Sequence, residues 1–371
     1  MGQTMTPAST GTRLKALRER HGYSQEQLAQ RFGFKNHQTI AQIEGGQRKL
    51  SAEELVLAVG AFGVDLDYFT NPFLIVGEAR FSWRRRTELE AAELDEFETR
   101  AGEWIGAYRE LSVATGNALS PIVHRLNLTR FDSYEAAEAA GEGVAGFLKL
   151  GPVPSQRLAD AMQQQLATLV LMVDAKAGIS GAACLVRDLG AVLVNRNEPL
   201  GRRNFDLAHE LFHVLTWDAM PPERLDDGVG SGKIQKRIEQ MAEKFASALL
   251  IPRDVLARHP VTEIDYAWLN RTATALGVTS RALKWRLVSI GVMDAETART
   301  FDDRLLSHNG QSDARQDAIP PLFGRQFMTV MAGGIEKGHV SVRRIAKMLG
   351  VSIDGLGELF DAHGIARPFD M

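Results

Sequence analysis

The chain has little cysteine, little net charge and no long apolar run, and each shortage excludes a class of protein. Cys184 is the only cysteine among 371 residues, so an intramolecular disulfide and a thiolate metal cluster are both excluded. The formal net charge of −3 excludes a uniformly basic coat, and any contact with nucleic acid must come from a local patch. The longest apolar run, near residues 169–173, is far shorter than the roughly 20 residues of a membrane helix.

The remaining composition indicates a soluble protein of a reducing cytoplasm, with no membrane contact. Hydrophobic residues make up 44% of the chain and charged residues 24%, as in ordinary globular domains. A chain of 371 residues is long enough for more than one such domain. The first residues lack the apolar core of a signal peptide, and we predict a disordered tail over residues 1–11.

The first part of the chain, residues 12–69, has the pattern of short helices separated by turn signals. Ser24, with Gln27 three residues later, has the spacing of a capping box. Asn36 can cap the next helix, and Ser51 can start a fourth. Two short helices joined by a few residues are typical of a helix-turn-helix. A small helical bundle for protein interaction is the alternative.

Polar side chains and local positive charge favour DNA as the partner of this domain. Residues 1–50 contain eight lysines and arginines against three acidic residues. The run S-Q-E-Q-L-A-Q-R-F-G, followed by N-H-Q-T-I-A-Q-I-E-G-G, resembles the Xre/Cro-type helix-turn-helix family. That resemblance implies binding to a double-stranded DNA operator, with phosphate contacts displaced to the basic pair after the second helix. The candidate DNA contacts are Gln25, His37, Gln38, Thr39, Gln42, Arg48 and Lys49.

The next part of the chain, residues 71–132, has a charge-rich pattern that predicts a helical connector. It includes R-R-R at 84–86, which is more typical of a solvated helix face than of a second DNA site. Further on, apolar and partly β-branched runs at 168–173, 179–186 and 191–195 predict strands of a small sheet.

A helix after these strands carries the most informative motif, His209-Glu210-Leu211-Phe212-His213. We predict that Asn204 caps this helix. Side chains at i and i+4 lie on one face of a helix, so His209 and His213 can direct two imidazoles at one ion. Glu210 lies about 100° around the helix, where it can reach a water on that ion. The alternative is a surface helix with unrelated histidines, since roughly one or two in a hundred such chains would contain the motif by chance.

A catalytic zinc site needs a third protein ligand, and the helix expected to open at Ser231-Gly232 and to end at Pro252 offers one. Glu239 and Glu243 flank its apolar stripe. A half-buried pair of carboxylates is costly unless a positive charge compensates it. Zinc bound by Glu239 would do so, with Glu243 accepting the second N–H of a ligand histidine. The alternative is that both glutamates are exposed and pair with Lys236 and Lys244.

The run R-R-N-F-D-L-A-H-E-L-F-H, followed by E-Q-M-A-E-K-F-A-S-A-L-L-I-P, resembles the ImmA/IrrE family of metallopeptidases. That resemblance implies zinc held by His209, His213 and Glu239, with Glu210 as the general base. It also implies cleavage of a specific regulatory protein, typically a helix-turn-helix repressor. Asn or Asp is common in the family where this chain has Glu243, which weakens the role given to that residue. Mn²⁺ is left open as a substitute for zinc.

Together these patterns predict a multidomain fold with an all-α N-terminal part and an α+β centre. The expected parts are an all-α helix-turn-helix domain over 12–70, the connector over 71–132, a zincin-like metallopeptidase domain with a small sheet over 133–306, a polar linker over 307–318, and an α-helical C-terminal interaction or lid region over 319–371.

The function expected from this fold is that of a DNA-binding regulatory metallopeptidase in a bacterial-type stress response, cytoplasmic and nucleoid-associated. It would hydrolyse a peptide bond by means of a zinc-bound water and Glu210, with the substrate extended along a sheet edge. The alternatives are a transcriptional regulator whose peptidase-like domain senses a metal or ligand without cutting, and an antitoxin-like binding protein. A homodimer is left open, and Arg202, Arg203 and Tyr266 are candidates for stabilising the oxyanion.

Overall fold

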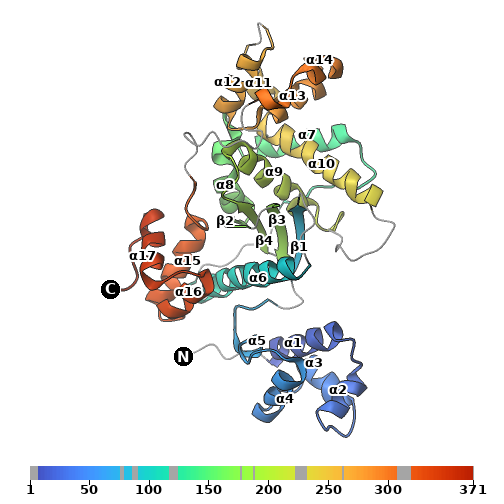
Figure 1. The fold of residues 1–371 in the computed structure, drawn as a ribbon, viewed down its shortest axis with the longest axis vertical. Coiled ribbons are helices and arrows are strands. Elements are labelled where there is room, and N and C mark those ends of the chain that lie inside the picture. The colour runs from blue at the N-terminus through green and yellow to red at the C-terminus, as the bar shows by residue number, and fades with distance from the viewer. Residues whose placement is uncertain are drawn as a thin grey trace.

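The structure is a computed structural model, and Figure 1 shows its helical N-terminal domain below a sheet that is covered by helices. The residues that it describes are 7–75, 79–85, 91–116, 124–175, 178–186, 189–221, 232–260, 263–306 and 319–370. The predicted linker at 307–318 lies outside these residues.

The N-terminal domain consists of five helices around one small core. They are α1 (Pro7–Arg20), α2 (Gln25–Arg31), α3 (Gln38–Glu44), α4 (Ala52–Phe62) and α5 (Asp67–Thr70). Leu28 and Phe32 pack against Ile40 and Ile43, which joins α2 to α3. The capping box predicted at Ser24 is confirmed, and Ser51 forms another at the start of α4.

Two predictions about this domain are wrong. Helix α1 begins at Pro7, because proline is favoured in the first turn of a helix, so residues 7–11 are not a disordered tail. Asn36 does not cap α3. His37 holds the cap position there without a side-chain hydrogen bond.

A four-stranded sheet forms the centre of the chain, in the order β1-β3-β4-β2. The three predicted strands are confirmed as β2 (Thr168–Val173), β3 (Ile179–Val186) and β4 (Leu189–Asn195). Strand β1 (Ala79–Arg85) was not predicted, and it corrects the all-helical interpretation of the connector. Strand β3 runs antiparallel to both β1 and β4, whereas β2 is parallel to β4.

One face of the sheet is covered by the helix that carries the histidine motif and by its neighbours. Leu211 and Phe212 belong to the core on this face, together with Phe245 of the adjacent helix. The helices of this half are α7 (Tyr134–Phe147), α8 (Pro154–Gln165), α9 (Leu200–Thr216), α10 (Gly232–Leu250), α11 (Arg253–Leu256), α12 (Tyr266–Leu276), α13 (Ser280–Ser289) and α14 (Ala295–Thr300), followed by the 3₁₀ turn η1 (Asp303–Leu305).

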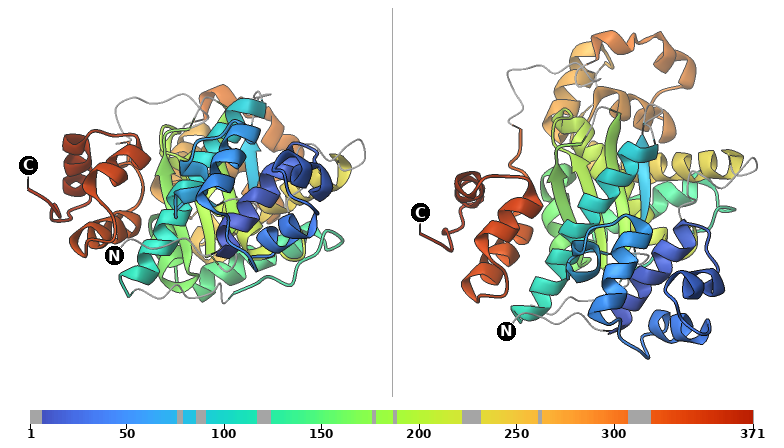
Figure 2. Two further views of the ribbon diagram at one scale, coloured as in Figure 1. Left: turned by 90° about the horizontal axis from the view of Figure 1, so that it is seen from below. Right: turned by 60° about the horizontal axis from the view of Figure 1, so that its bottom comes forward.

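The opposite face is covered by α6 (Ala91–Ala114) and by the C-terminal helices α15 (Arg325–Glu336), α16 (Val342–Leu349) and α17 (Ile353–Ala362). Trp104 of α6 donates a hydrogen bond to the Met348 carbonyl at 3.1 Å. Figure 2 shows α15–α17 beside the sheet. These helices therefore lie against the face opposite to α9, and in this position they do not form a lid over the histidines. Within the described residues, no helix has both the length and the apolar character needed to cross a membrane.

Helices α7 and α10 approach each other closely at Gly141. A Cβ atom at this position would lie 2.4 Å from the Phe245 carbonyl oxygen, whereas a Cβ at the exposed Gly143 would meet nothing within 4 Å. The helix pair behind the histidine motif therefore depends on a glycine at residue 141.

We expect Gly141→Ala to lower the free energy of unfolding by on the order of 1–3 kcal/mol, because two packed helices must separate. The matched control in the same helix, Gly143→Ala, should raise it by roughly 0.5–1 kcal/mol, because alanine favours the helix. Urea unfolding followed by circular dichroism measures both variants. Equal midpoints for the two would contradict this account of the helix pair.

Candidate metal centre and DNA-binding surface

Helix α9 begins earlier than the sequence indicated. Its first residue is Leu200, after Pro199, so the prediction that Asn204 caps the helix is wrong. Asn204 lies within the helix, where its amide donates to the Gly277 carbonyl at 2.8 Å. This bond fixes α9 to the end of α12, and the extra turn adds Arg202 and Arg203 to the helix.

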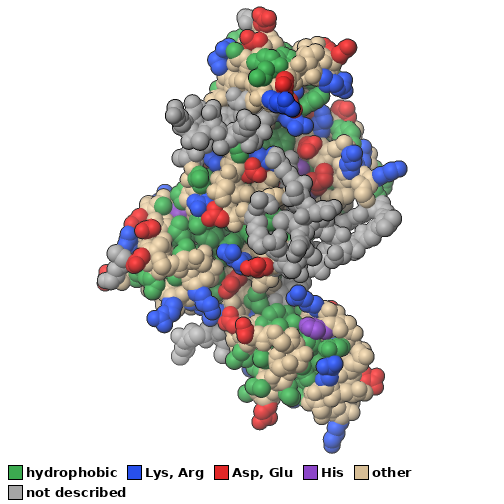
Figure 3. Space-filling model, viewed as in Figure 1, with side chains coloured by type: hydrophobic (Ala, Val, Ile, Leu, Met, Phe, Trp, Pro, Cys, Tyr) green, Lys and Arg blue, Asp and Glu red, His purple; other side chains and the backbone are tan. Residues whose placement is uncertain are grey.

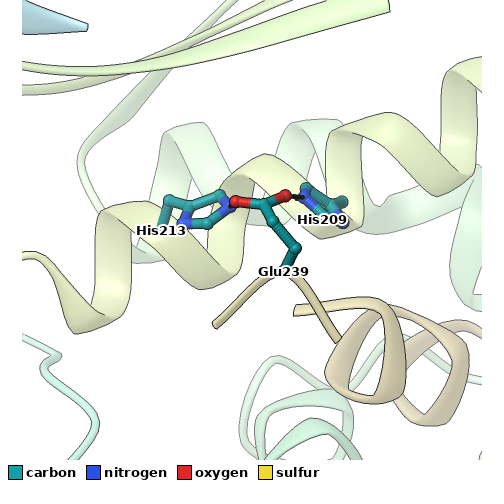
Figure 4. Close-up of side chains that lie close together, drawn as sticks. All are labelled: His209, His213 and Glu239. Carbon is teal, nitrogen blue, oxygen red and sulfur yellow. Dashed lines mark hydrogen bonds and ion pairs between the residues drawn. The ribbon is translucent and has the colours of Figure 1, made fainter. Parts of the chain in front are cut away.

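The structure brings His209 and His213 of α9 together with Glu239 of α10 (Figure 4). The two Nε2 atoms lie 3.2 Å apart. Glu239 Oε2 lies 3.1 Å from His209 Nε2, and Glu239 Oε1 lies 3.6 Å from His213 Nε2. Both histidines are buried, whereas the Glu239 side chain is 36% exposed.

These separations fit a tetrahedral metal ion. Zinc binds nitrogen and oxygen at about 2.0–2.2 Å, and two such ligands at a tetrahedral angle are about 3.3–3.5 Å apart. The two Nε2 atoms are 3.2 Å apart and Glu239 Oε2 is 3.1 Å from His209 Nε2, both close to that value, and one ligand atom from each of the three residues lies within 4.8 Å of the others. Two imidazoles and one carboxylate are also the donor set of known catalytic zinc sites. The side chains present therefore fit zinc.

The electrostatics of Glu239 suit a ligand of a cation. Burial alone would raise its pKa, but the hydrogen bond with His209 and the charges of the two imidazoles outweigh that effect and bring the pKa to about 2. The carboxylate is thus ionised across the physiological range, and a metal ligand of this type must be ionised.

Glu210 lies on another side of α9, against the sheet. Its side chain has no exposed surface. A Cβ atom added to Gly181 of β3 would lie 3.3 Å from Glu210 Cγ and 3.6 Å from its Oε1. The absence of a side chain at Gly181 therefore leaves the room that this carboxylate occupies. A glycine inside a strand can signal such a close approach, but the sequence analysis did not use that signal.

Glu243 lies one turn beyond Glu239 on α10, and its side chain is exposed. The sequence predicted that it lies beside a ligand histidine, in a half-buried pair with Glu239. The exposure fits a contact at the edge of the site better than a buried one. Its role there stays a prediction.

A row of polar side chains that was not predicted from the sequence continues from Glu210 along α9. Asp206 and Arg202 precede Glu210 by one and two helical turns, and the Arg202 Nε lies 3.6 Å from the fully buried Asp206 carboxylate. Arg202 also donates to Ser180 Oγ of β3 at 3.1 Å. The i, i+4 spacing of 202, 206 and 210 was the available signal.

The other two candidates for the oxyanion are engaged elsewhere. Arg203 donates to the carbonyls of Arg196 and Glu198. The hydroxyl of Tyr266 accepts from the Asp302 amide at 2.8 Å. Arg202 is therefore the candidate that lies on the same helix row as Glu210.

On the N-terminal domain, the predicted base-reading side chains are mostly exposed. His37, Gln38 and Gln42 are exposed on and beside α3, and Thr39 is half-buried. Gln38 and Gln42 are one turn apart, so both lie on the same exposed face. Figure 3 shows basic and acidic side chains mixed over the visible surface, without a coat of one sign.

The remaining DNA candidates differ in their surroundings. Lys49 is exposed. Arg48 is half-exposed and pairs with Glu54 at 2.7 Å, so it also holds the start of α4. The Gln25 amide donates a hydrogen bond to the Glu44 carboxylate at 2.8 Å. The Arg18 guanidinium donates to the same carboxylate at 2.6 Å. Gln25 therefore positions α2 against α3 through this carboxylate.

Two family models match separate parts of the chain. Residues 14–69 match the family model for a helix-turn-helix. Residues 164–288 match the peptidase-family model described as the IrrE N-terminal-like domain. Comparison with curated proteins gives no match. Among solved structures, the apo form of the competence regulator ComR from Streptococcus vestibularis aligns with 98% of this chain and 100% of its own, at 10% identity and a TM-score of 0.17.

We expect the purified chain to bind about one zinc ion, because three protein ligands converge on a single point. His213→Ala should lose most of it, since two ligands hold zinc far more weakly. Metal analysis after dialysis measures the content. The control is Lys236→Gln, an exposed change on α10 that should leave binding intact. Zinc retained at one per chain by the His209→Ala/His213→Ala variant would show that the metal lies elsewhere.

We expect Gln38→Ala and Gln42→Ala to weaken binding to an operator selected from random DNA by about 1–3 kcal/mol each, and to weaken binding to random DNA much less. Lys49→Ala and Arg48→Ala should weaken both alike and lower the salt slope by about 1. Lys49→Ala is the more specific test of a phosphate contact, because Arg48 also pairs with Glu54. Fluorescence anisotropy at several salt concentrations measures these effects. Equal losses on every sequence for the glutamine variants would mean that α3 reads no bases.

Proposed function

Since residues 14–69 match a helix-turn-helix family model and residues 164–288 match an IrrE-like peptidase model, we propose that the chain is a DNA-binding regulatory metallopeptidase. Its substrate is a specific regulatory protein, of which a helix-turn-helix repressor is the first candidate. The observation that carries the proposal is the convergence of His209, His213 and Glu239, whose ligand atoms lie within 4.8 Å of one another. Glu210 follows the first of these ligands in the sequence and lies under β3.

The chain's own residues supply the ligands and the proton transfer. His209, His213 and Glu239 would hold zinc, which when bound polarises a carbonyl and makes water a better nucleophile at neutral pH. Glu210 takes the proton of the attacking water and passes it to the leaving amine. Arg202 bonds both Asp206 and Ser180, and these contacts hold the turns of α9 that precede Glu210 against β3.

A DNA-binding domain on the same chain would hold the peptidase near the operator that this domain binds. If the substrate is a repressor bound near the same operator, tethering raises the effective concentration of enzyme around it. This argument favours a DNA-associated substrate over bulk protein. It needs no direct contact between the peptidase half and DNA.

A second candidate function is a transcriptional regulator whose peptidase-like domain senses a metal without cutting. Its support is the complete burial of Glu210 and the near-complete burial of His209, because a substrate must reach both groups. The two candidates differ in one observable, which is the appearance of a new protein N-terminus in the cell.

We expect Glu210→Gln to reduce cleavage at least 100-fold, because a general base contributes about 10²–10⁴ to such a rate. The variant should retain zinc and DNA binding, since glutamine has the same shape as glutamate. Comparison of protein N-termini in cells that carry the native chain, Glu210→Gln or the control Lys236→Gln identifies the substrate. One fragment should be present with the native and control chains and absent with Glu210→Gln. Identical sets of fragments in all three would support the sensor.

A further inference from the structure

The edge of the sheet next to the candidate site is occupied by a strand from outside the matched peptidase range. Strand β1 pairs antiparallel with β3 from Ala79 opposite Val186 to Arg85 opposite Ile179. It comes directly after the helix-turn-helix domain in the sequence, whereas β3 lies within the peptidase half. Figure 1 shows β1 alongside β3, with its carboxyl end toward α9 and α10.

Strand β3 is also the strand that covers Glu210. Gly181 faces this carboxylate at van der Waals distance, and the β1 residue opposite Gly181 is Arg84. The carboxyl end of β1 therefore lies beside the part of β3 that covers the turn of α9 with the proposed general base.

An extended peptide needs an unpaired strand edge to add to a sheet. At the other edge, the outer side of β2 receives the segment before α15, where the Phe323 amide donates to the Met172 carbonyl at 2.6 Å. A Cβ at Gly324 would lie 2.7 Å from the Val170 carbonyl. The edge beside the candidate site is therefore that of β3, and β1 covers it from Ile179 to Val186 except at Ser180.

The pairing of β1 with β3 is interrupted at the end nearest the site. The register shifts between Arg84 and Arg85, which leaves Ser180 of β3 outside the pairing. Ser180 instead bonds Arg202 of α9. Such bulges disrupt the ladder locally and occur next to active sites. The carboxyl end of β1 is thus the end from which the strand can most easily separate.

The opposite end of β1 is held near the DNA-binding domain. The buried Arg13 of α1 donates to the carbonyls of Tyr68, Asn71 and Leu74. This arginine fixes the backbone that leads into β1, so a displacement of the N-terminal domain acts on the strand through a short stretch of chain.

We propose that the β3 edge is the docking surface for an extended segment of the substrate protein, and that β1 is its internal occupant. Strand β1 must leave β3 before a substrate strand can bind beside Glu210. The inference rests on the proposed function in so far as the docked segment is a substrate. Under this inference, the chain does not cut a substrate until β1 leaves the β3 edge.

The test locks β1 in place with the chain's single cysteine. Phe81 lies directly opposite Cys184 and packs against the same core, and facing residues of antiparallel strands are about 4.5–5.5 Å apart at Cα, as a disulfide requires. Phe81→Cys is made in the full-length, zinc-loaded chain and again with Glu210→Gln. Binding of fluorescently labelled, unfolded β-casein is measured by anisotropy before and after oxidation, and mass spectrometry verifies the disulfide.

Oxidation should weaken casein binding at least tenfold, and reductant should restore it. The matched control, Phe81→Cys with Cys184→Ala, should not respond. Ser82→Pro should strengthen binding several-fold, because proline weakens the pairing of a strand. Binding that is equal in both redox states, or unchanged in Ser82→Pro, overturns the inference. Because binding is read on the Glu210→Gln chain, a redox switch without any cleavage by the native chain would keep this inference and remove only the peptidase activity.

Discussion

The burial of α9 is the constraint on which the rest of the structure depends. The helix lies between the sheet and α10, and from Asp206 to Thr216 every side chain is buried. A helix that buried would ordinarily be apolar, yet this one carries Asp206, His209, Glu210 and His213. Buried polar groups are costly unless they have partners. The neighbouring elements meet this need on two sides, with Glu239 of α10 facing the histidines and Ser180 of β3 facing the Arg202 row.

The two faces of the sheet have different roles. The face that packs on α9 contains the candidate metal centre, whereas the opposite face packs on α6 and the C-terminal helices. Trp104 of α6 bonds the end of α16, so the C-terminal region stabilises the sheet from behind. Strand β1 is the element that links the DNA-binding domain to the strand above Glu210. Regulation of the site is therefore expected to act through the sheet edge.

Much of this arrangement could be predicted from the sequence, because it follows from local signals. The helix caps at Ser24 and Ser51, three of the four strands and the spacing of His209 and His213 all depend on short patterns. The structure brings Glu239 to the histidines as the sequence analysis expected, although the role of these residues stays a proposal. Strand β1 carried a usable signal, because Ala79, Phe81 and Trp83 alternate with polar residues as in a half-buried strand. It was missed because the basic run at 84–86 was interpreted as a helix face, and because its pairing partner lies about a hundred residues away. The start of α9 was misplaced because Asn204 bonds a distant carbonyl instead of capping the helix.

X-ray absorption at the zinc edge, on the zinc-loaded chain, tests the central claim most directly. The account predicts a shell of nitrogen and oxygen near 2.0–2.1 Å with the signature of two imidazoles. It predicts no sulfur, because Cys184 lies in the core on the other face of the sheet. A sulfur ligand near 2.3 Å, or a shell without imidazole, would contradict the assignment of His209, His213 and Glu239 as the metal centre.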